Sequence, residues 1–207
     1  FLGFGTMNGP DGKPFKTRDG GVMSLSSLLN TVQTTAKSKL LENNPNATDE
    51  DALRIGVAAL KFGDLINHPS SDYAFDVDKF LAFEGKTGSY ILYNNVRILG
   101  ILERLQQDPE VIAPQKTIAS ENERNLILLL LRNPEQFQMA MTEHSPSYVT
   151  ENTYNIAAAF AKFYAEHNII KEENAEQQNS WLNLLKVTHK TLEFNLDKLG
   201  IKTVKAM

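Results

Sequence analysis

A cluster of cations near the beginning of the sequence could do chemistry on phosphates. Lys13, Lys16 and Arg18 fall within six residues of one another, in the segment Gly9-Pro10-Asp11-Gly12-Lys13-Pro14-Phe15-Lys16-Thr17-Arg18. Glycines allow the backbone to approach a ligand closely, and the cations could neutralise a polyphosphate. The segment is not a Walker loop, because it lacks the Gly-Lys-Ser/Thr ending that opens a helix. Spacing alone leaves two interpretations open: a phosphate-binding loop or a basic surface hairpin.

A second candidate site lies on the helix expected over residues 87–107. At about 100° per residue, four of its side chains fall within roughly 60° on one flank of the apolar face. These four are Tyr90, Tyr93, Arg97 and Arg104. Tyrosine rings stack on unpaired bases and arginine binds phosphates or base edges, so the stripe suits single-stranded RNA. The alternative is an ordinary core boundary with its polar ends in solvent, and the residues alone favour that alternative.

Other polar and aromatic groups give weaker signals. The four histidines show no i, i+4 pair and no carboxylate at the spacing of a metal site, so we expect no bound metal. Asp76, Asp78 and Glu84 could form an acid–base pair, but aspartates at a helix start are more commonly capping residues. Four aromatic residues of the last two helices are expected in the core: Phe160, Phe163, Tyr164 and Trp181.

The bulk composition bounds the class of protein. The 207 residues are 42% hydrophobic, which is enough for a sizeable core, and they include no cysteine. Disulfides, zinc–thiolate sites and a thiol nucleophile are therefore excluded, and a cytoplasmic location is expected. The net charge of −4 means that any RNA contact must come from a local patch. The longest apolar run, residues 126–131, is too short to span a membrane, so we expect no membrane partner.

Two unequal parts make up the chain. Residues 1–23 are glycine-rich and strand-like, whereas residues 24–207 carry the start and stop signals of helices. The expected helices cover residues 24–41, 48–67, 80–83, 87–107, 120–131, 145–167 and 174–199, with Gly200 just past the last one. The pattern predicts an all-α helical bundle preceded by a short strand and loop. Because the first residues read as the interior of a strand, we interpret the chain as a fragment of a longer protein.

The cation-rich segment resembles a known signature. Lys13-Pro14-Phe15-Lys16-Thr17 is similar to the Lys-Met-Ser-Lys-Ser motif of class I aminoacyl-tRNA synthetases, in the form found in the arginyl enzymes. Residues 75–87 resemble the segment that leads into the anticodon-reading helix of that family, and residues 180–207 resemble its last helix and tail. The resemblance covers nearly the whole chain. Departures occur at four positions, namely Lys86, Ser89, Leu92 and Trp181.

This resemblance implies roles for particular residues. Residues 1–23 would be the end of an α/β catalytic domain, and residues 24–207 a helical anticodon-binding domain of the DALR type. Lys16 would stabilise the charge that builds on the departing pyrophosphate, with Lys13 and Thr17 assisting. An RNA-binding role carries over to four residues: Tyr90, Tyr93, Arg97 and Met207.

The implied parent protein is a ligase that joins arginine to its tRNA with ATP and Mg²⁺. No His-x-Gly-His element and no nucleotide-binding βαβ pattern occur in the sequence. We therefore expect this fragment to bind the anticodon region of arginine tRNA as a monomer, to hold no cofactor and to catalyse nothing. Arginine and ATP would bind to the missing catalytic domain.

Two alternatives stay open from the sequence. The chain could be a non-catalytic helical interaction module whose basic loop binds an acidic partner, or it could come from a class I synthetase of another amino-acid specificity. A further expectation concerns residues 1–23. Without neighbouring strands they have no ladder to join, so we expect them to be largely detached from the bundle.

Overall fold

A computed structural model describes residues 3–9, 12–13, 24–42, 44–113 and 118–207. Its elements in chain order are β1 (Met7–Asn8), α1 (Leu25–Leu41), α2 (Asp49–Leu65), β2 (Tyr73–Ala74), α3 (Val77–Phe80), α4 (Gly88–Arg104), α5 (Glu121–Leu131), α6 (Asn133–Thr142), α7 (Ser147–Glu166), the 3₁₀ turn η1 (Ile169–Lys171) and α8 (Ala175–Lys198). The all-α expectation is confirmed. None of the described helices combines the length and the apolarity that crossing a bilayer requires.

Side-chain caps explain where most helices begin. Ser24 caps α1, Thr48 caps α2 in a reciprocal capping box with Asp51, and Thr87 caps α4. A cap oxygen accepts a hydrogen bond from a backbone N–H that the first turn leaves unpaired, which fixes the starting residue. Asn174 caps α8 in the same way. At the other end of α8, Gly200 takes a left-handed φ of 68°, as expected for the residue after a helix.

Two expected helix starts differ in detail. Ser120 caps α5, but the carboxylate of Glu123 does not complete a capping box with it: it accepts hydrogen bonds from Ala119 N (2.8 Å) and from the Trp181 indole (3.3 Å). Ser145 was expected to cap α7. Instead its hydroxyl lies 2.7 Å from that of Ser147, and α7 begins without a side-chain cap.

The apolar run that ends α5 does not continue as one helix. Arg132 ends α5 and directly precedes α6, whose first turn contains Pro134. Asn133 at this junction is buried and joins a hydrogen-bonded group of polar side chains: Asn152 and Thr153 of α7 and Asn195 of α8. Neither α6 nor this buried polar group was predicted from the sequence.

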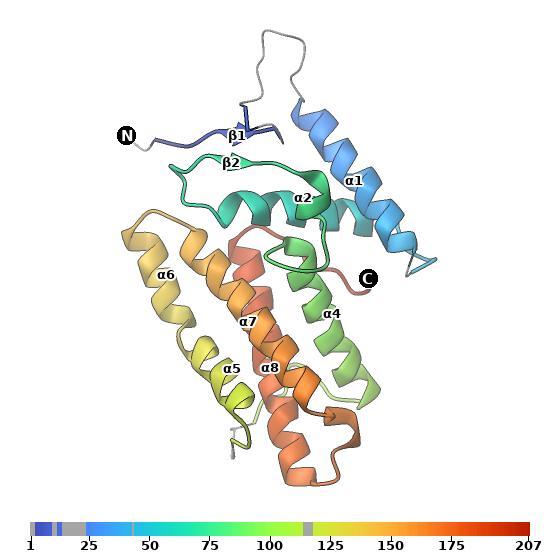
Figure 1. The fold of residues 1–207 in the computed structure, drawn as a ribbon. Helices are drawn as coiled ribbons and strands as arrows, with labels where there is room; N and C mark the ends of the chain where they lie inside the picture. The colour runs from blue at the N-terminus through green and yellow to red at the C-terminus, as the bar shows by residue number, and fades with distance from the viewer. Residues whose placement is uncertain (1–2, 10–11, 14–23, 43, 114–117) are drawn as a thin grey trace.

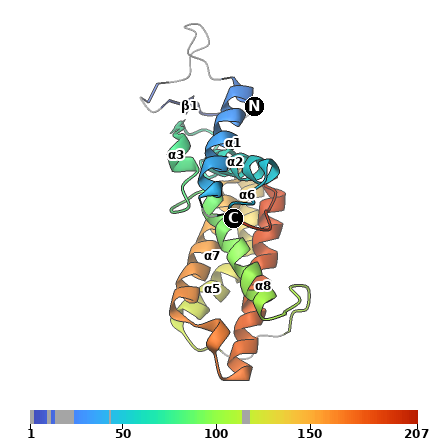
Figure 2. The same cartoon turned by 90° about the vertical axis from the view of Figure 1, so that its right-hand side faces the viewer.

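The helices form a long bundle with a second layer across one end (Figure 1). Helices α4, α7 and α8 pack on one another, with α5 and α6 against α7. Helix α1 packs along α2, and α2 packs on α4, so this pair covers one end of the bundle in both views (Figures 1 and 2). The largest fully buried side chains include Phe62, Ile91, Ile98, Phe160 and Phe163. The chain ends beside α1, α2 and α4.

The first described residues are attached to the body of the protein, contrary to expectation. Strand β1 pairs in parallel with β2, with Met7 opposite Tyr73 and Asn8 opposite Ala74. The expectation of a detached segment assumed that no edge was available for pairing. The segment between α2 and α3 provides one, because residues 73–74 are extended and present free backbone groups to residues 7–8.

Candidate nucleic-acid interface

Helix α4 brings two of the predicted RNA-binding residues into direct contact. Arg97 follows Tyr93 by one turn, and its Nη2 donates a hydrogen bond of 2.6 Å to the Tyr93 hydroxyl. The guanidinium carbon lies 4.6 Å from the centre of the Tyr93 ring. Tyr93 is 38% exposed, so this cation–aromatic pair is open to solvent on one side.

A tyrosine from α7 completes the stack. The Arg97 guanidinium also lies 5.3 Å from the centre of the Tyr164 ring, so it contacts one tyrosine ring on each of two helices. Tyr164 was expected in the core together with Phe160 and Phe163. Both phenylalanines are fully buried, but Tyr164 is only partly buried. Its role was missed because the contact joins two helices that no sequence spacing relates.

A hollow of about 380 Å³ opens beside this stack. It is lined by Lys39, Leu40, Phe83, Tyr93 and Met207. The Phe83 and Tyr93 rings meet edge to face at 6.3 Å. The hollow therefore has aromatic and apolar walls and a cation, which are the groups that hold an unpaired base and its phosphate.

The position of Met207 depends on contacts of the preceding tail with α2. Ile201 and Val204 are buried, the carbonyl of Thr203 accepts a hydrogen bond of 3.1 Å from Arg54, and the carbonyl of Gly200 accepts one from Lys61. Because the tail is held along its length, the last residue comes to lie across the hollow from Tyr93. The end of α1, the segment before α4, α4 itself and the C-terminal residue thus line one site, and α2 holds the tail in place.

Tyr90 does not line the hollow. It is half-buried, and its ring lies 5.8 Å from that of Tyr154 on α7. Burial raises the pKa of the Tyr90 hydroxyl, with a further contribution from Tyr154. Lys86 lies 5.6 Å from the centre of the Tyr154 ring and forms an ion pair of 2.6 Å with Glu151. The predicted stripe therefore divides into an open pair, Tyr93 and Arg97, and a packed Tyr90. Arg104 is exposed and lies at the C-terminal end of α4, away from these residues.

The cation-rich loop is described only in part. Lys13 is exposed, whereas Lys16 and Thr17 lie outside the described residues. At its base, Gly9 N donates to Lys13 O (2.8 Å) and Gly12 N to Gly9 O (2.9 Å), so Gly12 and Lys13 lie beside Gly9. Gly12 has a φ of 74°, a conformation that favours glycine.

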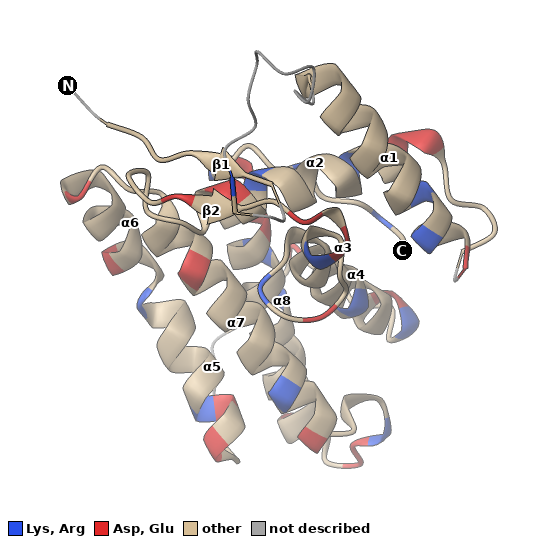
Figure 3. Cartoon of the chain, turned by 45° about the horizontal axis from the view of Figure 1, so that its top comes forward, with Lys and Arg blue, Asp and Glu red and all other residues tan. Residues whose placement is uncertain are grey.

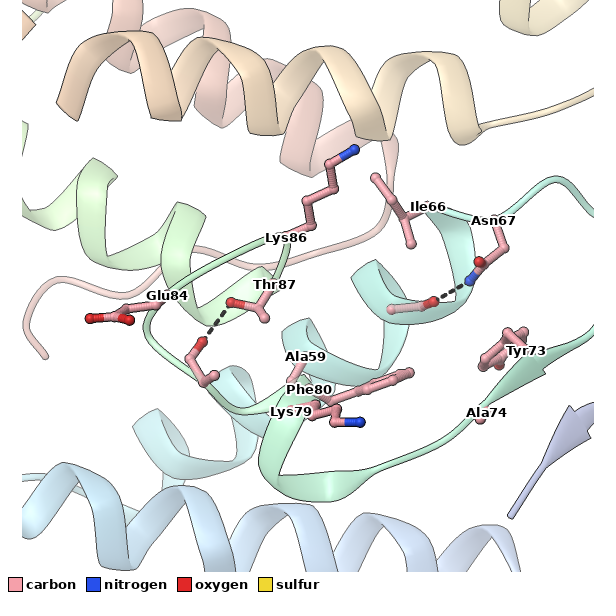
Figure 4. Close-up of a pocket in the computed structure, with 12 residues that line it drawn as sticks. Ala59, Ile66, Asn67, Tyr73, Ala74, Lys79, Phe80, Glu84, Lys86 and Thr87 are labelled. Atoms are coloured by element: carbon pink, nitrogen blue, oxygen red, sulfur yellow. Dashed lines mark hydrogen bonds between the residues drawn. The ribbon is translucent and has the colours of Figure 1, made fainter. Parts of the chain in front are cut away.

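Other expected roles can be located as well. Asp76 caps α3 by accepting from the N–H groups of Asp78 and Lys79, and the Lys79 N–H lowers the pKa of its carboxyl. Trp181 is buried in the core. Within the described residues, no three metal-ligating side chains gather in one place. A second pocket, of about 420 Å³, lies between α2, α3 and the start of α4 (Figure 4). Glu84 lines this pocket without Asp76 or Asp78, and none of the described residues predicted to bind RNA lines it.

Comparison with known proteins shows the family of the chain. The family model of the DALR anticodon binding domain matches residues 91–207, and that of the arginine-specific class I tRNA synthetase catalytic domain matches residues 1–77. The chain belongs to the arginyl-tRNA synthetase family. It is 44% identical to the arginine–tRNA ligase of Alkaliphilus oremlandii over all of its own length and 36% of that protein. It is 36% identical to that of Pseudomonas savastanoi over 100% of the chain and 36% of that protein.

Solved structures of arginyl-tRNA synthetases have the same fold. The enzyme of Thermus thermophilus matches with a TM-score of 0.86 and 26% identity, over 100% of this chain and 35% of that one. The Plasmodium falciparum enzyme matches with a TM-score of 0.80 and 28% identity, over 89% and 34%. The chain thus spans about 36% of the length of its curated relatives. The catalytic family match reaches residue 77, past the expected boundary between residues 23 and 24, and that boundary stays a prediction.

Proposed function

We propose that this chain is the anticodon-binding part, with the end of the catalytic part, of an arginine–tRNA ligase. The single observation that carries the RNA-binding role is the contact of Arg97 with both Tyr93 and Tyr164 beside the hollow that Met207 lines. A lone tyrosine at a core boundary would need no such arrangement. Two tyrosine rings in contact with one guanidinium, next to an open aromatic hollow, suit an unpaired base and a phosphate.

The geometry suggests that these residues contact different parts of the RNA. A base that enters the hollow would stack on the Tyr93 ring, with Met207 and Phe83 as apolar walls. Arg97 keeps donor groups beyond the one that it gives to Tyr93, and these would meet a phosphate oxygen or a base edge. Lys39 adds a second cation to the lining, where its ammonium also lies 3.6 Å from a carboxylate oxygen of Asp78. Figure 3 shows basic residues on α1 near the end of the chain. A local basic site of this kind can bind RNA although the net charge of the chain is −4.

The parent reaction follows from the family. In it the carboxylate of arginine would attack the α-phosphate of ATP and release pyrophosphate, and the arginyl group would then pass to the terminal ribose of the tRNA. Lys16 would stabilise charge on the pyrophosphate oxygens, with Lys13 and Thr17 beside it. The described residues offer no cluster of metal ligands for Mg²⁺, so we assign no step to it. The activation chemistry would take place in the cytoplasm, in a monomeric parent enzyme.

Two consequences separate this proposal from a generic helical interaction module. The purified chain binds tRNA but forms no arginyl-tRNA, because most of the catalytic domain is absent from its 207 residues. It also distinguishes arginine tRNA from the same tRNA with altered anticodon bases, in a direct titration at moderate salt. Equal affinity for the two RNAs would remove the support for an anticodon-reading role.

A further inference from the structure

Asp72 holds the segment that leads into the cation-rich loop. One carboxylate oxygen, Oδ1, accepts a hydrogen bond from the Thr6 backbone N (2.7 Å) and one from Thr6 Oγ1 (3.0 Å), whose single proton is shared with Asn8 Oδ1 (3.0 Å). Two donors on one carboxylate oxygen stabilise its ionised form, and they lower the pKa of Asp72 below its ordinary value. The two residues are 66 positions apart in the sequence.

The backbone on either side of this contact fixes the register. Gly5 N donates to Pro69 O (2.8 Å), Tyr73 N donates to Thr6 O (3.1 Å), and Phe75 N donates to Asn8 O (2.8 Å). A side chain at Gly5 would collide with the carbonyl of Ser71, so glycine is required for this approach. Residues 5–8 therefore lie against residues 69–75 in one register only.

The segment that receives β1 is itself fixed to α2. The Tyr73 hydroxyl donates a hydrogen bond of 2.7 Å to Asp64, and the Phe80 ring occupies the space beside Gly63 where a side chain would stand. Figure 4 shows Tyr73 and Phe80 on this side of α2. Gly9 directly follows β1, and its N–H donates to the carbonyl of Lys13, so the position of Lys13 follows from that of β1.

We propose that Asp72 is a positioning residue for Lys13: through Thr6 it fixes the base of the cation-rich loop on α2, and so places this lysine for the activation of arginine. The inference rests on the proposed function of the parent enzyme. Asp72 touches no substrate in this role. Its effect is on the geometry of a loop whose cation must meet a phosphate, and misplacement of a reacting group by about 1 Å costs on the order of 100-fold in rate.

The test uses the complete parent enzyme and ATP–pyrophosphate exchange with saturating tRNA. Asp72→Ala is expected to lower kcat for exchange about 10-fold, less than a full misplacement because the backbone pairing of β1 remains. Asp72→Asn keeps the accepting oxygen and should restore activity to within about threefold of wild type. Affinity for tRNA should not change in either variant. Asp197→Ala removes a surface aspartate whose carboxylate pairs with its neighbour Lys198, so it is the matched control and should behave as wild type.

A double-variant cycle separates positioning from general stability. If Asp72 acts through Lys13, then Asp72→Ala should lower kcat little further when Lys13→Ala is already present. An equal loss in both backgrounds would contradict the inference, and so would full activity of Asp72→Ala or of Lys13→Ala alone. The proposed function has its own readout, since it requires arginine-dependent exchange by wild type and loss of exchange in Lys16→Ala. Exchange that depends on Lys16 but not on Asp72 would overturn the positioning role alone.

Discussion

A lysine in a phosphate-binding loop contributes by meeting charge that develops during the reaction. Lys16 occupies the second lysine position of the Lys-x-x-Lys-Thr pattern, and we propose that in the parent enzyme it stabilises the departing pyrophosphate. In the parent enzyme, Lys16→Ala should slow arginine activation by about 10²–10³, the usual cost of removing one positioned charge-stabilising donor. Affinity for tRNA should change little. Pyrophosphate exchange at the wild-type rate in this variant would rule out the catalytic role of the loop.

The buried imidazole of His189 makes the stability of the fold depend on pH. Its Nδ1 lies 2.8 Å from Asn95 Oδ1 and its Nε2 lies 3.3 Å from Glu193, with Glu110 and Lys190 as the other charged neighbours. Burial lowers the pKa of the imidazole below its ordinary value of 6.5, and Glu193 opposes this only in part. The unfolded chain therefore takes up a proton at a higher pH than the folded one.

Because the unfolded chain binds this proton more tightly than the folded one, acidification lowers the stability of the fold. The stability that His189 contributes by staying neutral is fully present above pH 6.5 and declines as pH falls from there toward the lowered pKa. The free energy of unfolding, measured with urea between pH 5 and pH 8, should therefore fall on acidification. His189→Gln should flatten that decline, whereas the exposed His144→Gln should leave it unchanged. A decline of the same size in the His189 variant would show that other groups cause it.

Individual residues were predictable where a single element determines their surroundings. The spacing of Tyr93 and Arg97 predicted that they share one flank of a helix, where the structure has them in contact, and the apolar face of that helix is buried at Ile91 and Ile98. Contacts between elements were not predictable. The only sequence signal for the contact of Tyr164 with Arg97 is the position of Tyr164 on the edge of an apolar helix face. The spacing that placed Tyr90 beside Tyr93 gave no sign that Tyr154 packs against Tyr90.

Helix α4 allows a matched test at the scale of an element, because it holds two glycines with opposite surroundings. A side chain at Gly88 would collide with the backbone of Ala58 on α2, whereas Gly100 has nothing within 4 Å of that position. Gly88→Ala should lower the free energy of unfolding by about 1–3 kcal/mol, because the close approach of α2 and α4 cannot adjust cheaply. Gly100→Ala should raise it by about 0.4–1 kcal/mol.

Both variants are measured by urea unfolding of the same chain. The substitution is identical and the helix is the same, so a difference in sign can come only from the surroundings of each site. If both variants are stabilised, the packing of α2 on α4 tolerates a methyl group and is looser than described. If both are destabilised, the region around Gly100 is in contact with other residues.

Helix starts were readable from sequence because capping is local. Ser24, Thr48, Thr87 and Asn174 each satisfy backbone donors within three residues of themselves. The division between α5 and α6 was missed because its cause is partly tertiary: Asn133 at the break satisfies polar side chains on α7 and α8. The pairing of β1 with β2 was missed for a similar reason, since two-residue strands carry almost no periodic signal.

On the scale of the whole molecule, the candidate RNA site depends on the assembly of distant segments. The end of α1, the segment before α4, α4 itself and the C-terminal residue line one hollow. No composition measure reveals it, because basic residues are diluted by acidic ones over the rest of the surface (Figure 3). The bundle supplies the rigidity, with α2 holding both the tail and the N-terminal strand segment.

The central claim is that this hollow and the adjacent stack read the anticodon of arginine tRNA. The most direct measurement compares the chain with its Tyr93→Ala/Arg97→Ala variant, each titrated with arginine tRNA and with an anticodon-altered tRNA at two salt concentrations. The wild type should prefer arginine tRNA, and the variant should lose about 1–3 kcal/mol of binding and most of that preference. Its salt dependence of log K should flatten by about one unit. Tyr93 is 38% exposed, so the variant should stay folded, which circular dichroism checks. If wild type and variant bind both RNAs with equal affinity, this role of the hollow is contradicted.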